Sequence, residues 1–117
     1  MTVAGLPHVA AAFVYGSVAS GEATPESDCD FMVVTGPEAT RDERRAVEKA
    51  LAVQTGDTSR ALGRELQVVV YSAQELRTRA SAGRGFVPRV MEGAKRWVVG
   101  SADALESLIA VPPAEAG

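Results

Sequence analysis

Short apolar runs alternate along the chain with longer segments in which apolar residues recur at helical spacing. Each short run predicts a strand, which is expected to be buried for the first run and is rich in β-branched residues in the third. The predicted strands cover residues 11–15, 29–34, 65–71 and 96–99. The intervening segments predict a helical turn and several helices. The turn covers residues 17–20, and the helices cover residues 38–54, 58–62, 73–82, 86–92 and 102–110.

Turn and cap residues mark the ends of these elements. Thr55-Gly56-Asp57 predicts a break or a bend after the helix that starts at residue 38. Ser72 and Glu75 have the spacing of a capping box, which predicts a helix start at residue 73. Pro112-Pro113 ends the last helical segment, so residues 111–117 are predicted to be a disordered tail.

The order of these elements predicts the fold class. The chain has 117 residues, which suits a single domain spanning residues 1–117 with its core at about 11–110. Strands and helices follow one another without regular βαβ repetition. The sequence therefore predicts an α+β protein, an α/β sandwich with a small mixed sheet of about four strands flanked by helices.

Bulk properties narrow the function classes. The net charge of −3 gives no direct evidence for nucleic-acid binding. No apolar run is long enough to cross a membrane, and with a single cysteine the expected location is the cytoplasm. Charge is nevertheless uneven, because residues 22–48 are mostly acidic and residues 77–96 mostly basic. Two interpretations stay open, namely two solvated faces, or a basic wall that faces an acidic metal site across a polyphosphate.

One segment carries most of the chemistry. Gly16-Ser17 follows the first predicted strand, and after ten residues Asp28-Cys29-Asp30 opens the second. Carboxylates at i and i+2 of a strand point to the same face and can share Mg²⁺ or Mn²⁺. Gly16 allows the backbone to approach a phosphate, and the Ser17 hydroxyl and the following N–H groups can bind it.

The pattern Gly-Ser-x-Ala-x-Gly-Glu-Ala-x-x-x-Ser-Asp-x-Asp, which starts at Gly16, resembles the minimal branch of the polymerase-β-like nucleotidyltransferase superfamily. Residues 63–72 are similar to the third-strand region of that branch, and the resemblance covers about residues 11–100. It implies the polymerase-β-like fold and Mg²⁺-dependent transfer of a nucleoside monophosphate from a nucleoside triphosphate to a hydroxyl. Asp28 and Asp30 would be the catalytic metal ligands, and Gly16, Ser17 and Ser27 would bind the nucleotide.

Two positions depart from the pattern of active family members. The third carboxylate of the superfamily aligns with Gln67, whose neutral amide is neither a useful base nor a charged metal ligand. Glu65 points to the same strand face and is an alternative carboxylate. Ser20 stands where active minimal members commonly have an arginine. Arg64, Arg84 and Arg89 are candidate replacements for that cation.

Three functions are compatible with these residues. The first is a nucleotidyltransferase. The second is a catalytically weak or inactive nucleotide-binding module that regulates a partner protein, since similar domains are often fused to winged-helix regulators. The third is a degenerate interaction domain that binds no nucleotide. Exposed sheet edges also favour a protein partner or a homodimer. The aromatic residues are interpreted as core; they are Phe13, Phe31, Phe86 and Trp97.

Overall fold

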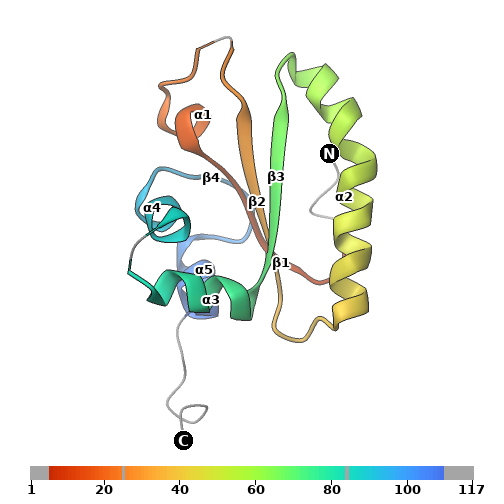
Figure 1. Ribbon diagram of the computed structural model, residues 1–117, viewed down its shortest axis with the longest axis vertical. Coiled ribbons are helices and arrows are strands. Elements are labelled where there is room, and N and C mark those ends of the chain that lie inside the picture. Colours follow the sequence, from red (N-terminus) through yellow and green to blue (C-terminus); the bar gives the residue numbers. More distant parts are fainter. Residues whose placement is uncertain (1–5, 25, 84, 110–117) are drawn as a thin grey trace, which may run out of the picture.

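The computed structural model describes residues 6–24, 26–83 and 85–109 (Figure 1). The elements follow one another as β1 (Val9–Tyr15), α1 (Gly16–Ser20), β2 (Cys29–Thr35), α2 (Arg41–Leu62), β3 (Leu66–Ser72), α3 (Ala73–Ser81), α4 (Phe86–Glu92), β4 (Arg96–Val99) and α5 (Ala102–Ile109). The predicted disordered tail and the candidate cation Arg84 lie outside the described residues.

The strands form one mixed sheet. Its order is β3-β2-β1-β4, with β1 antiparallel to both β2 and β4 and with β3 parallel to β2. Helices flank this four-stranded sheet, which confirms the predicted α+β class. The two strands that carry the Gly-Ser corner and the Asp-x-Asp pair are the two central ones, so the sheet places both motifs side by side.

Helices cover both faces of the sheet (Figure 1). One core cluster joins Phe13, Met32 and Val34 to buried side chains of α3, α4 and α5. A second cluster joins Phe31 and Val33 to buried side chains of α2. Because β2 is buried on both faces, its sequence is a continuous apolar run after Asp30 instead of an alternating one.

Helix α2 corrects two predictions. Of the predicted break or bend at residues 55–57, the break is wrong, because α2 continues through Gly56 to Leu62. Thr55 donates its hydroxyl to the Leu51 carbonyl at 2.7 Å, which satisfies the side chain inside the helix. The helix also starts at Arg41 and not at residue 38, because Thr40 caps it in a box with Glu43. A single exposed glycine costs a helix only about 1 kcal/mol, which packing of the apolar face outweighs.

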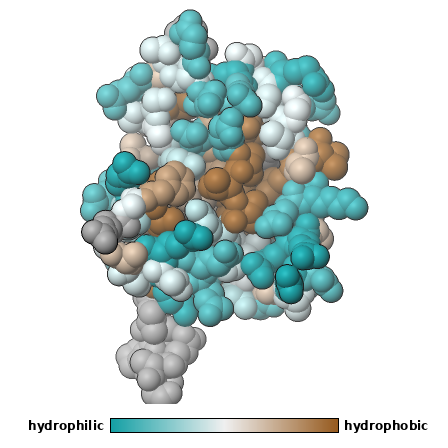
Figure 2. All heavy atoms as spheres, viewed as in Figure 1, coloured by the Kyte–Doolittle hydropathy of each residue, from teal (hydrophilic) through white to brown (hydrophobic). Residues whose placement is uncertain are grey.

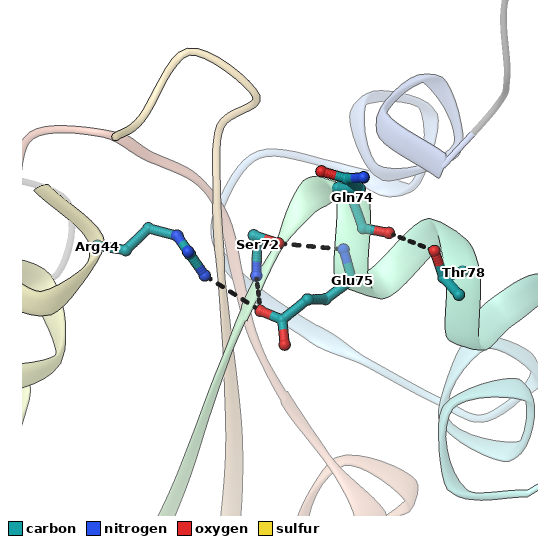
Figure 3. Close-up of polar contacts among 5 residues, drawn as sticks. All are labelled: Arg44, Ser72, Gln74, Glu75 and Thr78. Atoms are coloured by element: carbon teal, nitrogen blue, oxygen red, sulfur yellow. Dashed lines mark hydrogen bonds and ion pairs between the residues drawn. The ribbon is translucent and has the colours of Figure 1, made fainter. Parts of the chain in front are cut away.

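The predicted capping box at the start of α3 is confirmed (Figure 3). The Glu75 N–H donates to Ser72 Oγ at 3.1 Å, and the Ser72 N–H donates to Glu75 Oε1 at 3.1 Å. Arg44 of α2 reaches the same Glu75 oxygen at 3.4 Å. The cap fixes the direction in which the chain leaves β3, and the ion pair joins helices from opposite faces of the sheet.

The other element ends match the prediction or differ from it by one or two residues. Strand β1 begins at Val9, two residues early, and β3 runs one residue late, from Leu66 to Ser72. Phe13 and Phe31 are buried as predicted, and the partly buried Trp97 packs on Phe13 with ring centroids 5.0 Å apart. The core interpretation is wrong for Phe86, which is 42% exposed at the start of α4.

An apolar surface is visible between β3 and α2 (Figure 2). The groove there is lined by Leu51 and Ala52 of α2 and by Val68 and Val70 of β3. Leu51, Val68 and Val70 belong to the core cluster on the α2 face of the sheet. Asp30 alternates with Phe31 and therefore faces the opposite side, so this groove is separate from the Asp-x-Asp motif. None of the helices described here is both long and apolar enough to cross a membrane.

Candidate active site at the Gly-Ser corner

The Asp-x-Asp motif lies where β2 begins. Asp30 is paired across the antiparallel ladder with Tyr15, the last residue of β1, and across the parallel ladder with Gln67. Asp28 precedes the strand by one residue and is exposed. The sheet therefore brings the end of β1, the start of β2 and the start of β3 to one edge, with Asp30 in the middle.

Gly16 fits the Asp30 carboxylate closely. It adopts a positive φ of +73°, and a Cβ built on it would lie 2.5 Å from Asp30 Oδ2. Both features require glycine, since other residues rarely adopt this φ and a side chain would displace the carboxylate. Glycine at position 16 therefore has two structural roles: it allows the chain to turn, and it leaves space for the Asp30 carboxylate.

The site concentrates negative charge. Burial raises the pKa of Asp30 above its ordinary value, and the Asp28 carboxylate raises it further. Burial, with smaller contributions from Asp30 and Tyr71, raises the pKa of Tyr15 to about 12, so its phenol stays neutral. Among the described residues, neither aspartate forms an ion pair with a basic side chain. A cation would relieve the repulsion between the two carboxylates.

Replacing Asp30 with asparagine is expected to stabilise the metal-free protein at neutral pH. A carboxyl group whose pKa is raised by folding binds more protons in the folded state, so the unfolding free energy falls as pH rises through the folded pKa. Asp30→Asn removes this penalty, and its advantage over wild type should shrink as pH drops toward 4. Urea unfolding at pH 7 and pH 4 without divalent cations measures the effect. An Asp30→Asn variant that is less stable than wild type at pH 7 would contradict a raised pKa of Asp30 in the folded protein.

Arg64 holds the loop that carries Asp28. Its Nη1 donates to the Ser27 carbonyl at 3.0 Å and to the Thr24 carbonyl at 3.3 Å. The Ser27 hydroxyl accepts the Thr24 N–H at 2.9 Å. The hydrogen bonds of Ser27 and Arg64 therefore stabilise the loop beside the predicted nucleotide site. Sequence reasoning missed this role, because Arg64 and Ser27 lie 37 residues apart with no shared motif.

The position predicted for a third carboxylate is occupied by Gln67. The parallel register places exposed Gln67 directly beside Asp30. Glu65 is exposed just before β3, and its carbonyl accepts the Cys29 N–H at 2.8 Å. Among the residues that the structure describes, no group of three His, Cys, Asp or Glu side chains is placed to hold a metal. The carboxylates at the start of β2 are therefore those of Asp28 and Asp30, and Gln67 is a neutral neighbour of Asp30 in the sheet.

A cleft of about 460 Å³ opens next to this corner, between α1 and α4. Figure 1 shows both helices on the same side of the sheet. The α1 side contributes Tyr15, Gly16, Ser17, Ser20 and Glu22, and the α4 side contributes Phe86, Arg89 and Val90. The Ser20 hydroxyl donates to the Ser17 carbonyl at 3.2 Å, so it is used inside α1. The cleft thus places the predicted phosphate-binding residue Ser17 opposite an aromatic ring and a cation.

The sequence predicted a basic wall from the cations of segment 77–96. Among the described residues of that segment, Arg89 is the one basic residue that lines the cleft. Lys95 donates to the Met91 and Gly93 carbonyls, and Arg79 lies over the Tyr71 ring. Arg77 donates to the Leu108 carbonyl. Most of the positive charge of segment 77–96 therefore serves local packing or solvent contact.

The sequence matches the family described as Polymerase beta, Nucleotidyltransferase over residues 2–83. The chain belongs to this family. The paired aspartates at the start of β2, the Gly-Ser corner and the elements from β1 to α3 all lie within the matched region. No curated protein matches the sequence.

Two solved structures are distant neighbours. One is a toxin-antitoxin crystallised with AMP-PNP, at 14% identity and a TM-score of 0.48, which covers 91% of this chain and 73% of that chain. The other is a mutant of the toxin-antitoxin MntA-HpeT, at 15% identity and a TM-score of 0.46, which covers 91% of this chain and 72% of that chain.

Proposed function

We propose that this domain binds a nucleoside triphosphate together with one Mg²⁺ or Mn²⁺ at the Gly-Ser corner. The observation that carries the proposal is the Asp30 carboxylate, which lies against the glycine that begins α1 and beside Asp28, and which has no basic ion-pair partner among the described residues. Two carboxylates and the phosphates of a nucleotide are a sufficient ligand set for Mg²⁺, which keeps several waters.

The residues divide into a metal side and a phosphate side. Asp28 and Asp30 would hold the cation, and the Gln67 amide oxygen beside Asp30 adds a neutral ligand. The bound cation supplies charge neutralisation of the triphosphate. Ser17, which lines the cleft, offers its hydroxyl and backbone N–H to the phosphates. Gly16 permits close backbone approach to the same group.

Transfer is proposed to be slow. An acceptor hydroxyl must form a bond to the α-phosphorus while the bond to pyrophosphate breaks, and its proton needs a base. Gln67 stands beside Asp30 where the family pattern has a third carboxylate, and an amide does not accept a proton usefully near neutral pH. The proposal is therefore a nucleotide-binding domain with weak nucleotidyltransferase activity. The partner protein or second copy that would supply the acceptor stays a prediction.

Calorimetric titration tests the binding step. Wild-type protein titrated with ATP, and separately with GTP, is expected to bind with Mg²⁺ present and much more weakly with EDTA. The reason is that the paired aspartates repel the triphosphate unless a cation lies between them. Equal affinity with and without Mg²⁺ would contradict the proposed metal-bridged mode.

A further inference from the structure

The α4 side of the cleft carries an aromatic side chain that is only partly buried by its neighbours. Phe86 is 42% exposed at the start of α4. Its ring meets Tyr15 nearly at right angles, with centroids 5.8 Å apart and an interplanar angle of 70°. A perpendicular contact of this kind leaves much of the aromatic surface open. Phe86 lines the same cleft as Ser17, so part of its side chain borders the space next to the proposed phosphate site.

Arg89 adds a positioned cation one helical turn further along α4. Its Nε donates to the Gly85 carbonyl at 3.2 Å, which fixes the root of the guanidinium. Within the described residues Arg89 forms no ion pair with an acid. Arg64 donates to loop carbonyls and Arg79 lies over the Tyr71 ring, and unlike Arg89 neither of them lines this cleft.

The cleft also contains one acid, Glu22, on the α1 side. A carboxylate accepts hydrogen bonds and repels phosphate, so it suits hydroxyl or amino donors of a ligand. Phosphate at Ser17, an aromatic platform at Phe86 and an acceptor at Glu22 together match the parts of one nucleotide. The cleft volume is in the range of small-molecule sites.

We infer that the α1–α4 cleft is the nucleoside subsite of the proposed triphosphate site, in which Phe86 stacks on the base and Arg89 contacts the phosphates. This inference rests on the proposed function. Arg89 then supplies the positive charge absent at Ser20. Every base presents a π-face, so stacking on Phe86 binds purines and pyrimidines alike, and larger bases more strongly.

Two ligands separate the base from the phosphates. Affinities for ATP and for inorganic tripolyphosphate, which lacks a base, are measured by calorimetry with Mg²⁺. Phe86→Ala is expected to weaken ATP binding about tenfold, within the range known for aromatic stacking partners, and to leave tripolyphosphate binding unchanged. Phe86→Trp should retain ATP affinity. Val53→Ala, a change at an exposed apolar residue of α2, is the matched control and should change neither.

Arg89→Gln should weaken ATP and tripolyphosphate alike, by about tenfold, because a charge-assisted contact to phosphate is lost. Arg45→Gln removes the same charge from exposed α2 and controls for net charge. Wild-type binding of both ligands with unchanged ATP affinity in Phe86→Ala would overturn the base subsite and leave the proposed function standing. Equal losses of both ligands in Phe86→Ala would overturn it too, as a structural effect. No wild-type binding of either ligand would overturn the proposed function and the subsite with it.

Discussion

Replacing Gln67 with aspartate is expected to raise nucleotidyl transfer by about tenfold or more. The parallel register places residue 67 directly beside Asp30, so the new carboxylate would join the pair at the start of β2. It would add a proton acceptor and a charged ligand for a second divalent cation, and a positioned base typically contributes about a hundredfold or more to rate. Release of pyrophosphate from ATP with Mg²⁺ or Mn²⁺, followed under multiple turnover, measures the change.

The matched control is Gln67→Asn, which has the length of aspartate without its charge. This variant should transfer no faster than wild type. If the aspartate and asparagine variants have equal rates, the third position of the site is not residue 67. A rise in the asparagine variant alone would also contradict the argument, since it would point to a shape effect and not to a missing charge.

Replacing Gly16 with alanine is expected to reduce the affinity for Mg²⁺-ATP by at least about tenfold. The added Cβ would lie 2.5 Å from Asp30 Oδ2, so the carboxylate must move away from the position beside Asp28. Displacement of one of two acidic ligands removes a large part of the charge that holds the cation. Calorimetry with Mg²⁺-ATP measures the affinity, and thermal unfolding shows whether the variant still folds.

Gly21→Ala is the control for this variant. Gly21 also has a positive φ, +82°, and ends α1, but a Cβ there meets nothing within 4 Å. Both alanines therefore carry a similar backbone strain of about 1 kcal/mol, and only Gly16→Ala disturbs Asp30. Similar ATP affinities in the two variants would contradict the close fit between Gly16 and the carboxylate.

The parts of the site that could be predicted from sequence are local. The Gly-Ser corner, the aspartates two residues apart and the Ser72–Glu75 capping box are each encoded within a few neighbouring residues. The same holds for the strands, and the apolar runs of the central strands β1 and β2 reflect burial on both faces of the sheet. The family resemblance predicts residue 67 as the third position, and the structure pairs this residue with Asp30 across the parallel ladder.

The remaining features depend on packing between distant segments. Arg64 reaches a loop 37 residues earlier, and Phe86 meets Tyr15 only because α4 packs near the end of β1. No local pattern separates an aromatic residue at a cleft from one in the core, which is why Phe86 was predicted incorrectly. Helix α2 continues through Gly56 for a similar reason, since burial of Val47 and Leu51 stabilises the whole helix against a local breaker.

The most direct test of the central claim is the same ATP titration carried out on wild type and on the double variant Asp28→Asn/Asp30→Asn. The account predicts Mg²⁺-dependent binding by wild type and its loss in the double variant, which should remain folded because the metal-free site is relieved of repulsion. Wild-type affinity retained in the double variant would show that the nucleotide binds elsewhere, and it would contradict the assignment of the two aspartates as metal ligands.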